Sequence, residues 1–219
     1  MAPRAEQAVL ENLARKLGDL VEPERQISVA GSPTLDRDRW QELRTRVTSL
    51  VCTALMAPEL SPPALWTCAR PLREAMLGEQ VHITGFSEGI ERIKNEPNWH
   101  PRHPKVDKAI RRLCAERRRR CERYLAREVG LSPSHLGRLL RWETGRSFRE
   151  WRQAVVMLAG IRRLCESDEQ IAQIAYGLGY EHPTQFGREF REMFGTSPRE
   201  LRRMLVGARQ VVETESPRS

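Results

Sequence analysis

The fold of this chain is decided by LSPSHLGRLLRWETGRSFREW, residues 131–151, because the chain repeats its pattern about 50 residues later as YEHPTQFGREFREMFGTSPREL, residues 180–201. The matched positions, in order, are Leu136 and Phe186, Gly137 and Gly187, Arg138 and Arg188, Leu140 and Phe190, Arg141 and Arg191, Gly145 and Gly195, and Ser147 and Ser197. A tandem copy of apolar, glycine and arginine positions indicates two copies of one structural unit. We interpret that unit as a helix-turn-helix.

The first copy carries clear signals for where its helices begin and end. A supporting helix is predicted from about residue 120 to 129, followed by Gly130 in the tight turn. Ser132 is the expected N-cap of the second helix, with Pro133 at its first position. Gly145 should end this helix in a left-handed conformation. The second helix of the first copy is therefore predicted to span residues 133–144.

The second copy follows the same order. Apolar residues at helical spacing predict a supporting helix from Ile171 to Leu178. Gly179 then makes the turn, and Tyr180 fills the angle between the two helices. The partner helix is predicted from about Pro183 to Phe194, and Gly195 ends it.

One continuous helix is predicted between the copies, from Phe148 to about Glu166. With some 18 residues at about 1.5 Å each it is roughly 27 Å long. One turn of duplex DNA is about 34 Å, so a rigid linker of this length suits two recognition helices in successive major grooves. Ser197 and Pro198 predict the start of a final helix.

Each second helix has a polar face that is left free to enter a major groove. These faces carry short polar groups and arginines, the residue types that reach base edges and phosphates. The candidate DNA-binding residues are Ser134, His135, Gly137, Arg138 and Arg141 in the first copy, and His182, Thr184, Gln185, Gly187, Arg188 and Arg191 in the second.

Gly137 and Gly187 are unexpected inside helices, where glycine costs roughly 0.5 to 1 kcal/mol relative to alanine. They are either tolerated weaknesses or points where the helix approaches DNA closely. Their repetition at matched positions favours close approach.

The charge of the chain supports the same interpretation. The net charge is +8, yet residues 1–104 hold 13 Lys and Arg against 14 Asp and Glu, and the remainder holds 24 against 15. The basic character thus belongs to the half that contains the repeat. It indicates either binding to a polyanion or a solvated surface.

The first half of the chain is predicted to be helical but less regular. Leucines at helical spacing predict a short amphipathic helix within the first 20 residues, and proline and glycine predict a loop over residues 22–36. A second helix is expected from Asp36. A third should begin at Ser61, and Pro71 should kink or break it.

These predictions combine into an all-α protein with two helix-turn-helix subdomains joined by a linker helix and preceded by a smaller helical region. We expect a helical N-terminal region over residues 1–104, with a connecting segment at 78–104. The double helix-turn-helix domain should span residues 105–205. Residues 206–219 should form a flexible tail.

Two stretches resemble the DNA-binding domain of the AraC/XylS family of bacterial transcription regulators. They are LAREVGLSPSHLGRLLRWETGRSFREW, from Leu125 to Trp151, and IAQIAYGLGYEHPTQFGREFREMFGTSPRELR, from Ile171 to Arg202. The resemblance implies two helix-turn-helix units on a linker helix, binding to promoter DNA and contact with RNA polymerase. The positions that match the family's base-facing sites are Ser134, Gly137, Arg138, Pro183, Thr184, Gln185, Gly187 and Arg188.

The chain departs from the family pattern at several places. Cys121 replaces the usual serine cap of the first supporting helix, and Glu122 stands where a buried aliphatic residue is expected. In the linker helix Val156 replaces arginine and Gly160 replaces alanine, which predicts a looser helix. Residues 1–35 are too short for the effector-binding β-barrel that many members carry.

Other function classes find little support in the sequence. The five cysteines form no CxxC pair, and His100, His103, Cys114 and Cys121 fit no common zinc spacing. No catalytic constellation is present, so neither an enzyme nor a cofactor is expected. The absence of an apolar leader or span predicts a cytoplasmic protein with no membrane partner.

Two partner questions stay open. The N-terminal helices could form a homodimer interface. The chain could also be a helical interaction protein that modulates a full-length regulator without reading DNA itself.

Overall fold

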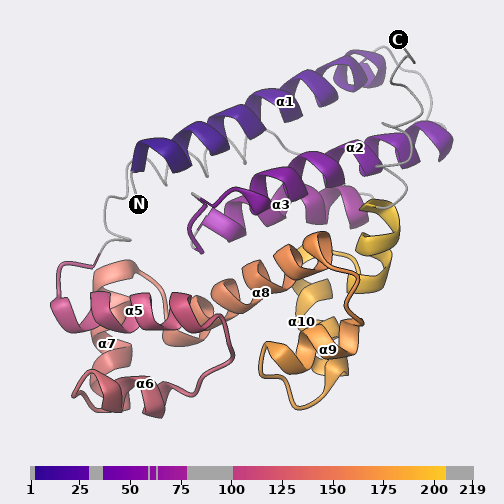
Figure 1. The fold of residues 1–219 in the computed structure, drawn as a ribbon. Coiled ribbons are helices and arrows are strands. Elements are labelled where there is room, and N and C mark those ends of the chain that lie inside the picture. Colours follow the sequence, from indigo (N-terminus) through magenta and orange to yellow (C-terminus); the bar gives the residue numbers. More distant parts are fainter. Residues whose placement is uncertain (1–2, 30–36, 59, 63, 78–100, 206–219) are drawn as a thin grey trace, which may run out of the picture. The chain divides into compact units, whose positions relative to one another are not determined.

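The structure is a computed structural model that describes residues 3–29, 37–58, 60–62, 64–77 and 101–205. Its regular elements in these ranges are all α-helices, and no strand occurs among them (Figure 1). The helices are α1 (Pro3–Val29), α2 (Arg37–Met56), α3 (Ala64–Leu77), α5 (Pro104–Glu116), α6 (Glu122–Glu128), α7 (Pro133–Thr144), α8 (Phe148–Glu166), α9 (Ile171–Gly177) and α10 (Pro183–Phe194), and residues 198–205 are also helical. The predicted all-α fold is confirmed.

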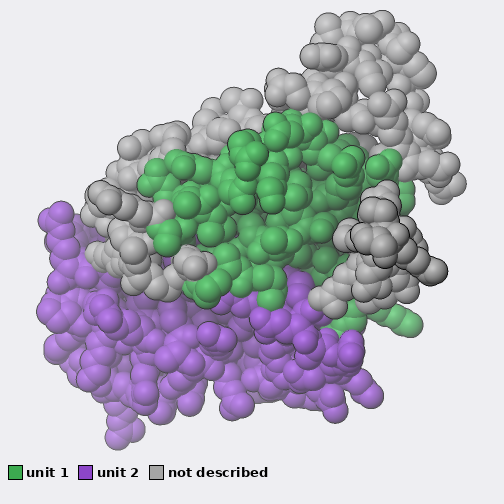
Figure 2. All heavy atoms as spheres, turned by 45° about the horizontal axis from the view of Figure 1, so that its top comes forward, with its two compact units in different colours: residues 1–60, 66–91, 187–219 green, residues 61–65, 92–186 purple. Residues whose placement is uncertain are grey.

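The chain divides into two compact units (Figure 2). One unit comprises residues 1–60, 66–91 and 187–219, and the other comprises residues 61–65 and 92–186. The second unit holds the whole first helix-turn-helix, the linker helix and the beginning of the second helix-turn-helix. The predicted segment 78–104 lies outside the described residues except for its last four, and so does the predicted tail.

Two expectations about prolines in the first unit are corrected in part: residues 22–29 are helical, while 30–36 lie outside the described residues, and Pro71 does not break its helix. Helix α1 continues through Pro23 to Val29, where the sequence predicted a loop, and α3 continues through Pro71 to Leu77 without breaking. A proline inside a helix costs about 3 kcal/mol. Packing outweighs that cost here, because α1 lies along α2 (Figure 1) and Leu72 and Ala75, which follow Pro71, are fully buried.

The second helix of each motif and the linker helix begin and end where the sequence predicted. Helices α7, α8 and α10 have the predicted bounds, and the helix after Ser197 is present. The supporting helix α6 is shorter than predicted at both ends. Its N-cap, Cys121, has an extended backbone, which ends the helix at Glu122, and makes no side-chain hydrogen bond to the first turn.

The first motif has its own apolar core. It gathers buried side chains from four helices: Val106, Ala109, Ile110 and Leu113 of α5, Leu125 and Ala126 of α6, Val129 beyond it, Leu136 and Leu140 of α7, and Phe148, Trp151 and Val155 of α8. Trp151 is 1% exposed, and its indole N–H donates a hydrogen bond to Thr144 Oγ1 at 2.9 Å. This bond fastens the end of α7 to the linker helix.

Helix α8 is buried on every side in its middle. Residues 154–161 are all buried, including Val156 and Gly160, where the chain departs from the family pattern. A Cβ atom added at Gly160 would lie 3.1 Å from the Phe186 ring and 3.2 Å from Leu178. The missing side chain thus lets the second motif pack closely onto α8, which gives Gly160 a packing role instead of marking a loose helix.

Two capping boxes stand 50 residues apart. The Ser147 hydroxyl accepts a hydrogen bond from the Glu150 N–H at 3.3 Å, and the Glu150 carboxylate accepts one from the Ser147 N–H at 2.7 Å. Ser197 and Glu200 form the same pair at 3.2 and 3.0 Å. Each serine hydroxyl also donates to its glutamate at 2.7 Å. The hydroxyl and N–H of Ser147 lower the pKa of Glu150 below its ordinary value, and the N–H and hydroxyl of Ser197 lower that of Glu200.

The lowered pKa values predict a loss of stability in acid. A carboxyl group whose pKa is lower in the folded state stabilises the protein above its unfolded pKa, about 4.3, and that contribution disappears as the pH falls through the folded value. Glu150→Gln should therefore lower the free energy of unfolding by about 1 kcal/mol at pH 7, and by progressively less below pH 4. Urea unfolding of both proteins between pH 7 and pH 3 measures the difference.

Glu192→Gln is the matched control, because Glu192 is exposed and accepts no hydrogen bond from the described residues. The difference in the free energy of unfolding between Glu192→Gln and the unsubstituted protein should not depend on pH. A Glu150→Gln effect that stays constant from pH 7 to pH 3 would contradict the capping role.

Candidate nucleic-acid interface

The first motif consists of α6, a four-residue turn and α7. Gly130 takes a φ of +67° in the turn, a left-handed conformation that glycine adopts without strain. Ser132 is extended, and its hydroxyl accepts a hydrogen bond from the His135 N–H at 3.3 Å at the start of α7. Gly145, with φ of +70°, ends the helix. The turn, cap and stop are those that the sequence predicted.

The second motif consists of α9, a turn and α10, and its turn is one residue longer. Gly179 takes a φ of +86°, and the Tyr180 N–H donates to the Ala175 carbonyl at 3.1 Å. Tyr180 is 3% exposed and meets the Phe186 ring edge-on at 5.4 Å between centroids. It fills the angle between the helices as predicted, whereas Leu131 in the first motif is only half-buried.

The candidate residues lie on the solvent-facing sides of α7 and α10, while the apolar positions between them are buried. The exposed candidates are Ser134, His135, Arg138, Arg141, His182, Thr184, Arg188 and Arg191, and the half-buried ones are Gly137, Gln185 and Gly187. Leu136, Leu140, Phe186 and Phe190 are at most 2% exposed. Each helix thus has one face in the core and one face toward solvent.

The arginines on these two faces form no hydrogen bond or ion pair within the described part of the chain, although the charges of Arg141 and Arg191 help to lower the pKa of Glu150 and Glu200. Neither hydrogen bonds nor ion pairs engage the guanidinium groups, which belong to Arg138, Arg141, Arg188 and Arg191. Some arginines elsewhere in the chain are paired, since Arg112 bonds Glu128 at 3.4 Å and Arg163 pairs with Glu169. Five donors per guanidinium are therefore available to a ligand at each of the four positions.

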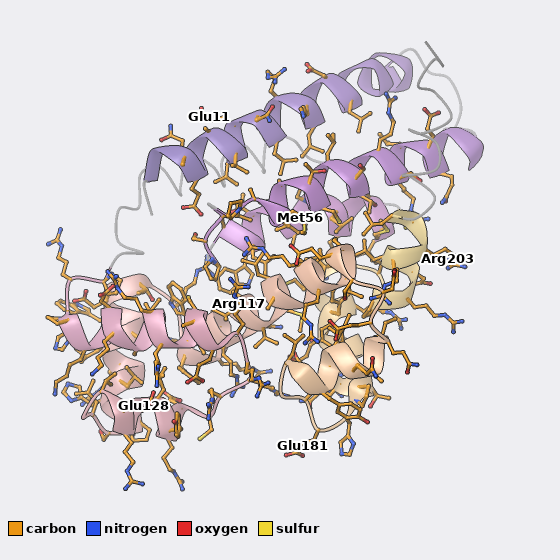
Figure 3. All side chains as sticks on the ribbon, in the orientation of Figure 1. Glu11, Met56, Arg117, Glu128, Glu181 and Arg203 are labelled. Carbon is orange, nitrogen blue, oxygen red and sulfur yellow. The ribbon has the colours of Figure 1, made fainter. Side chains whose placement is uncertain are left out.

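The run Arg117–Arg120 has a different role from the faces of α7 and α10. The Arg119 N–H donates to the Leu178 carbonyl at 2.8 Å, and its guanidinium lies 4.9 Å from the centre of the Tyr180 ring. Arg120 pairs with Glu116. Two of the four arginines are thus used inside the protein, and this segment fastens the first motif to the turn of the second. Arg117, at the end of α5 (Figure 3), and Arg118 remain exposed.

The two helical glycines have different surroundings. A Cβ atom at Gly137 would lie 2.9 Å from Glu122 Oε1, whereas at Gly187 no atom comes within 4 Å. Gly137 therefore makes room for a side chain of the supporting helix. At Gly187 the space that a Cβ would occupy is open. No contact among the described residues therefore requires a glycine at this position.

Glu122 occupies the place where the family pattern has a buried aliphatic residue. Its side chain is half-buried, as is Ile171 at the matching position of the second motif, so neither copy buries this position fully. Partial burial raises the pKa of Glu122, and the nearby charge of Arg152 opposes that rise. Glu122 and Gly137 together form a contact that the second motif lacks.

Sequence reasoning missed one exposed residue on the first face. Trp142 is 80% exposed on α7, more than any other large apolar side chain of the described residues. It follows Arg138 by four residues, and this spacing on a polar face was the signal that could have identified it. The matching position in the second motif is Glu192, which is also exposed. The acid of α7, Glu143, is engaged internally, where it accepts from the Arg102 N–H at 2.6 Å.

The described residues contain neither a metal-binding cluster nor a membrane-spanning helix. No three His, Cys, Asp or Glu side chains within these ranges lie close enough together to hold a metal ion. Within the same ranges no helix combines the length and the apolar composition needed to cross a membrane.

Comparison with known proteins finds similarity in the same region. Residues 125–204 match the model of a helix-turn-helix domain. The HTH-type transcriptional regulator GlxA of Rhizobium meliloti is 35% identical over 79 residues, the invasion protein InvF of Salmonella typhimurium is 35% identical over 83, and the HTH-type transcriptional activator RhaS of Pectobacterium atrosepticum is 32% identical over 78. No solved structure matches the chain.

The similarity is confined to one part of each protein. Each match covers 36% of this chain, and it covers 24% of GlxA, 37% of InvF and 28% of RhaS. The described helices α6 to α10 lie within or next to the matched residues. The first half of the chain has no counterpart in these matches.

The contrast between the two glycines yields a prediction. Gly187→Ala should raise the free energy of unfolding by about 0.5 to 1 kcal/mol, because alanine favours the helix and meets no atom. If Gly187 lets DNA approach, the same change should weaken binding to a specific site by about tenfold. Chemical unfolding and fluorescence anisotropy with labelled duplex measure the two effects.

Gly137→Ala is the matched variant, and it should gain less stability because the Glu122 carboxylate must move. A Gly187→Ala protein that is more stable and binds DNA as tightly as before would show that the glycine is only a tolerated weakness.

Proposed function

We propose that this chain, whose residues 125–204 form a helix-turn-helix domain of the AraC/XylS family, is a sequence-specific transcription regulator that binds promoter DNA through α7 and α10. The relatives named above include transcriptional regulators, and the residues that match the helix-turn-helix domain model, 125–204, cover both motifs. We propose no enzymatic activity for the chain.

The observation that carries this proposal is the set of matched, exposed arginines that form no hydrogen bond or ion pair within the described residues. Arg138 and Arg188 stand 50 residues apart on exposed helix faces, and so do Arg141 and Arg191. Four exposed guanidinium groups that form no hydrogen bond or ion pair within the described residues suit a surface whose partner is a polyanion. Their repetition at matched positions suits duplex DNA, in which two successive major grooves face the same side.

The roles of the residues follow from the positions along each helix. Arg138 and Arg188 lie near the middle of α7 and α10, where a recognition helix meets base edges, and each can bond O6 and N7 of a guanine. Arg141 and Arg191 lie one turn later and hold phosphates, as do the exposed Arg117 and Arg118. The shorter polar candidates at the starts of the helices complete the contacts: Ser134, His135, His182, Thr184 and Gln185.

Helix α8 sets the separation of the two motifs. Its 19 residues span about 28 Å, close to the roughly 34 Å between successive major grooves on one side of a duplex. RNA polymerase is the expected protein partner at a promoter. The N-terminal helices α1 to α3 are the candidate dimer interface.

Binding to DNA at several salt concentrations tests the proposal. The full chain should bind promoter fragments selected from its own genome with sequence discrimination, and log K should fall with log salt by about 0.9 per phosphate neutralised. A shallow, sequence-blind response would favour the other candidate, an interaction protein that modulates a full-length regulator. Fluorescence anisotropy against random duplex provides the reference.

Two arginine variants should separate base contacts from phosphate contacts. Arg188→Ala should cost about 1 to 3 kcal/mol on the specific site and much less on random duplex, so that the sequence preference relaxes. Arg141→Ala should weaken binding to both by a similar factor and reduce the salt slope by about 1. If Arg188→Ala weakened all sequences equally, Arg188 would be a phosphate contact.

A further inference from the structure

Trp142 presents an indole to solvent on the first recognition helix. Its side chain is 80% exposed, while the other exposed large apolar residues of the described ranges, Tyr176, Leu77 and Tyr124, reach 57%, 50% and 43%. Trp142 makes no hydrogen bond, ring contact or cation–π contact within the described part of the chain. Nothing in the fold of the second unit therefore accounts for a tryptophan at this position.

Trp142 belongs to the same face as the unpaired arginines of α7. A helix advances about 100° per residue, so Trp142 is turned only about 40° from Arg138, and Arg141 lies on the other flank of Arg138 by about 60°. The opposite side of the helix is in the core, where Leu136 and Leu140 are at most 2% exposed. A ligand that reaches Arg138 therefore also meets the indole.

The charge around the indole indicates what covers it. The face joins an apolar ring to two exposed guanidinium groups that form no ion pair within the described residues, so its ligand combines negative charge with apolar groups at a spacing of one helical turn. The major groove of duplex DNA offers both, because phosphates line it and the C5 methyl group of each thymine projects into it. This inference rests on the proposed function. We propose that Trp142 contacts thymine methyl groups in the half-site, the DNA segment bound by the first motif, and thereby makes that half-site select A·T pairs.

The second motif differs at the matching position. Glu192 is exposed there and carries an acceptor where the first motif carries an apolar ring. A carboxylate accepts a hydrogen bond from the N4 amino group of cytosine and offers nothing to a methyl group. The two half-sites therefore differ in sequence, with thymine preference confined to one of them.

Replacing thymine by uracil tests the contact, because the change removes the methyl group and leaves the base pairs intact. The site is first selected from a random duplex library with the full chain, and each thymine is then replaced singly. The unsubstituted protein should lose about fourfold in affinity at one or two thymines of one half-site. Trp142→Ala should lose a similar factor on the thymine duplex and show no further loss at those positions.

Two control variants keep the test specific. Trp142→Phe retains a ring and should retain most of the uracil sensitivity, while Tyr176→Ala removes an exposed aromatic side chain of α9 and should bind as the unsubstituted protein does. Circular dichroism confirms that each variant is folded. Since Trp142 is exposed, its replacement leaves the core of the first motif intact.

The outcomes distinguish this inference from the function on which it rests. If the unsubstituted protein selects no sequence, both are overturned. If it selects a site but Trp142→Ala keeps the same uracil profile, only the thymine contact is overturned. If Trp142→Ala binds DNA normally but loses promoter activity in a reporter strain, the indole contacts a protein and the thymine contact is again wrong.

Discussion

The burial of α8 on all sides is the constraint on which the rest of the DNA-binding region depends. Residues 154–161 cover more than two turns and all of them are buried. Helix α8 packs against α5, α7 and α9. A single helix thus completes the core of the first motif and supports the second, and a substitution in it should be felt by both.

A second connection between the motifs runs through the turn of the second one. The Arg119 N–H bonds the Leu178 carbonyl, and a Cβ atom at Gly179 would lie 3.3 Å from that nitrogen. The Arg152 guanidinium, from α8, donates to the Arg120 carbonyl at 3.3 Å. The segment between α5 and α6 is therefore held by both the linker helix and the second motif. The lack of a side chain at Gly179 permits both the left-handed conformation of the turn and the close approach of the Arg119 backbone.

The features that the sequence predicted correctly are those decided by near neighbours. The bounds of α7 depend on Ser132, Pro133 and Gly145, which act within the helix that they begin or end. The periodic burial of α10 follows from the spacing of Phe186 and its apolar neighbours. Caps, left-handed glycines and helical periodicity are local rules, so a single sequence suffices to apply them.

The features that escaped prediction depend on residues far apart in the chain. Helix α3 survives Pro71 because buried residues follow it, and this burial is not visible in the sequence. The partners of Arg119 lie some 60 residues away, so a run of four arginines looked uniform although its members differ. Of the candidate site, the sequence identified the faces and their arginines but missed Trp142. A tryptophan between arginine and glutamate suggests no apolar stripe, and its meaning emerges only from its exposure.

The central proposal is that the two motifs, which α8 joins, read DNA as one unit. The most direct test inserts one to five base pairs between the two half-sites of a selected duplex and measures the affinity of the full chain for each. The account predicts one preferred spacing. An insertion of five base pairs, about half a turn of DNA, should reduce the affinity to that of a single half-site. Equal affinity at every spacing would show that the motifs bind independently and would contradict the account.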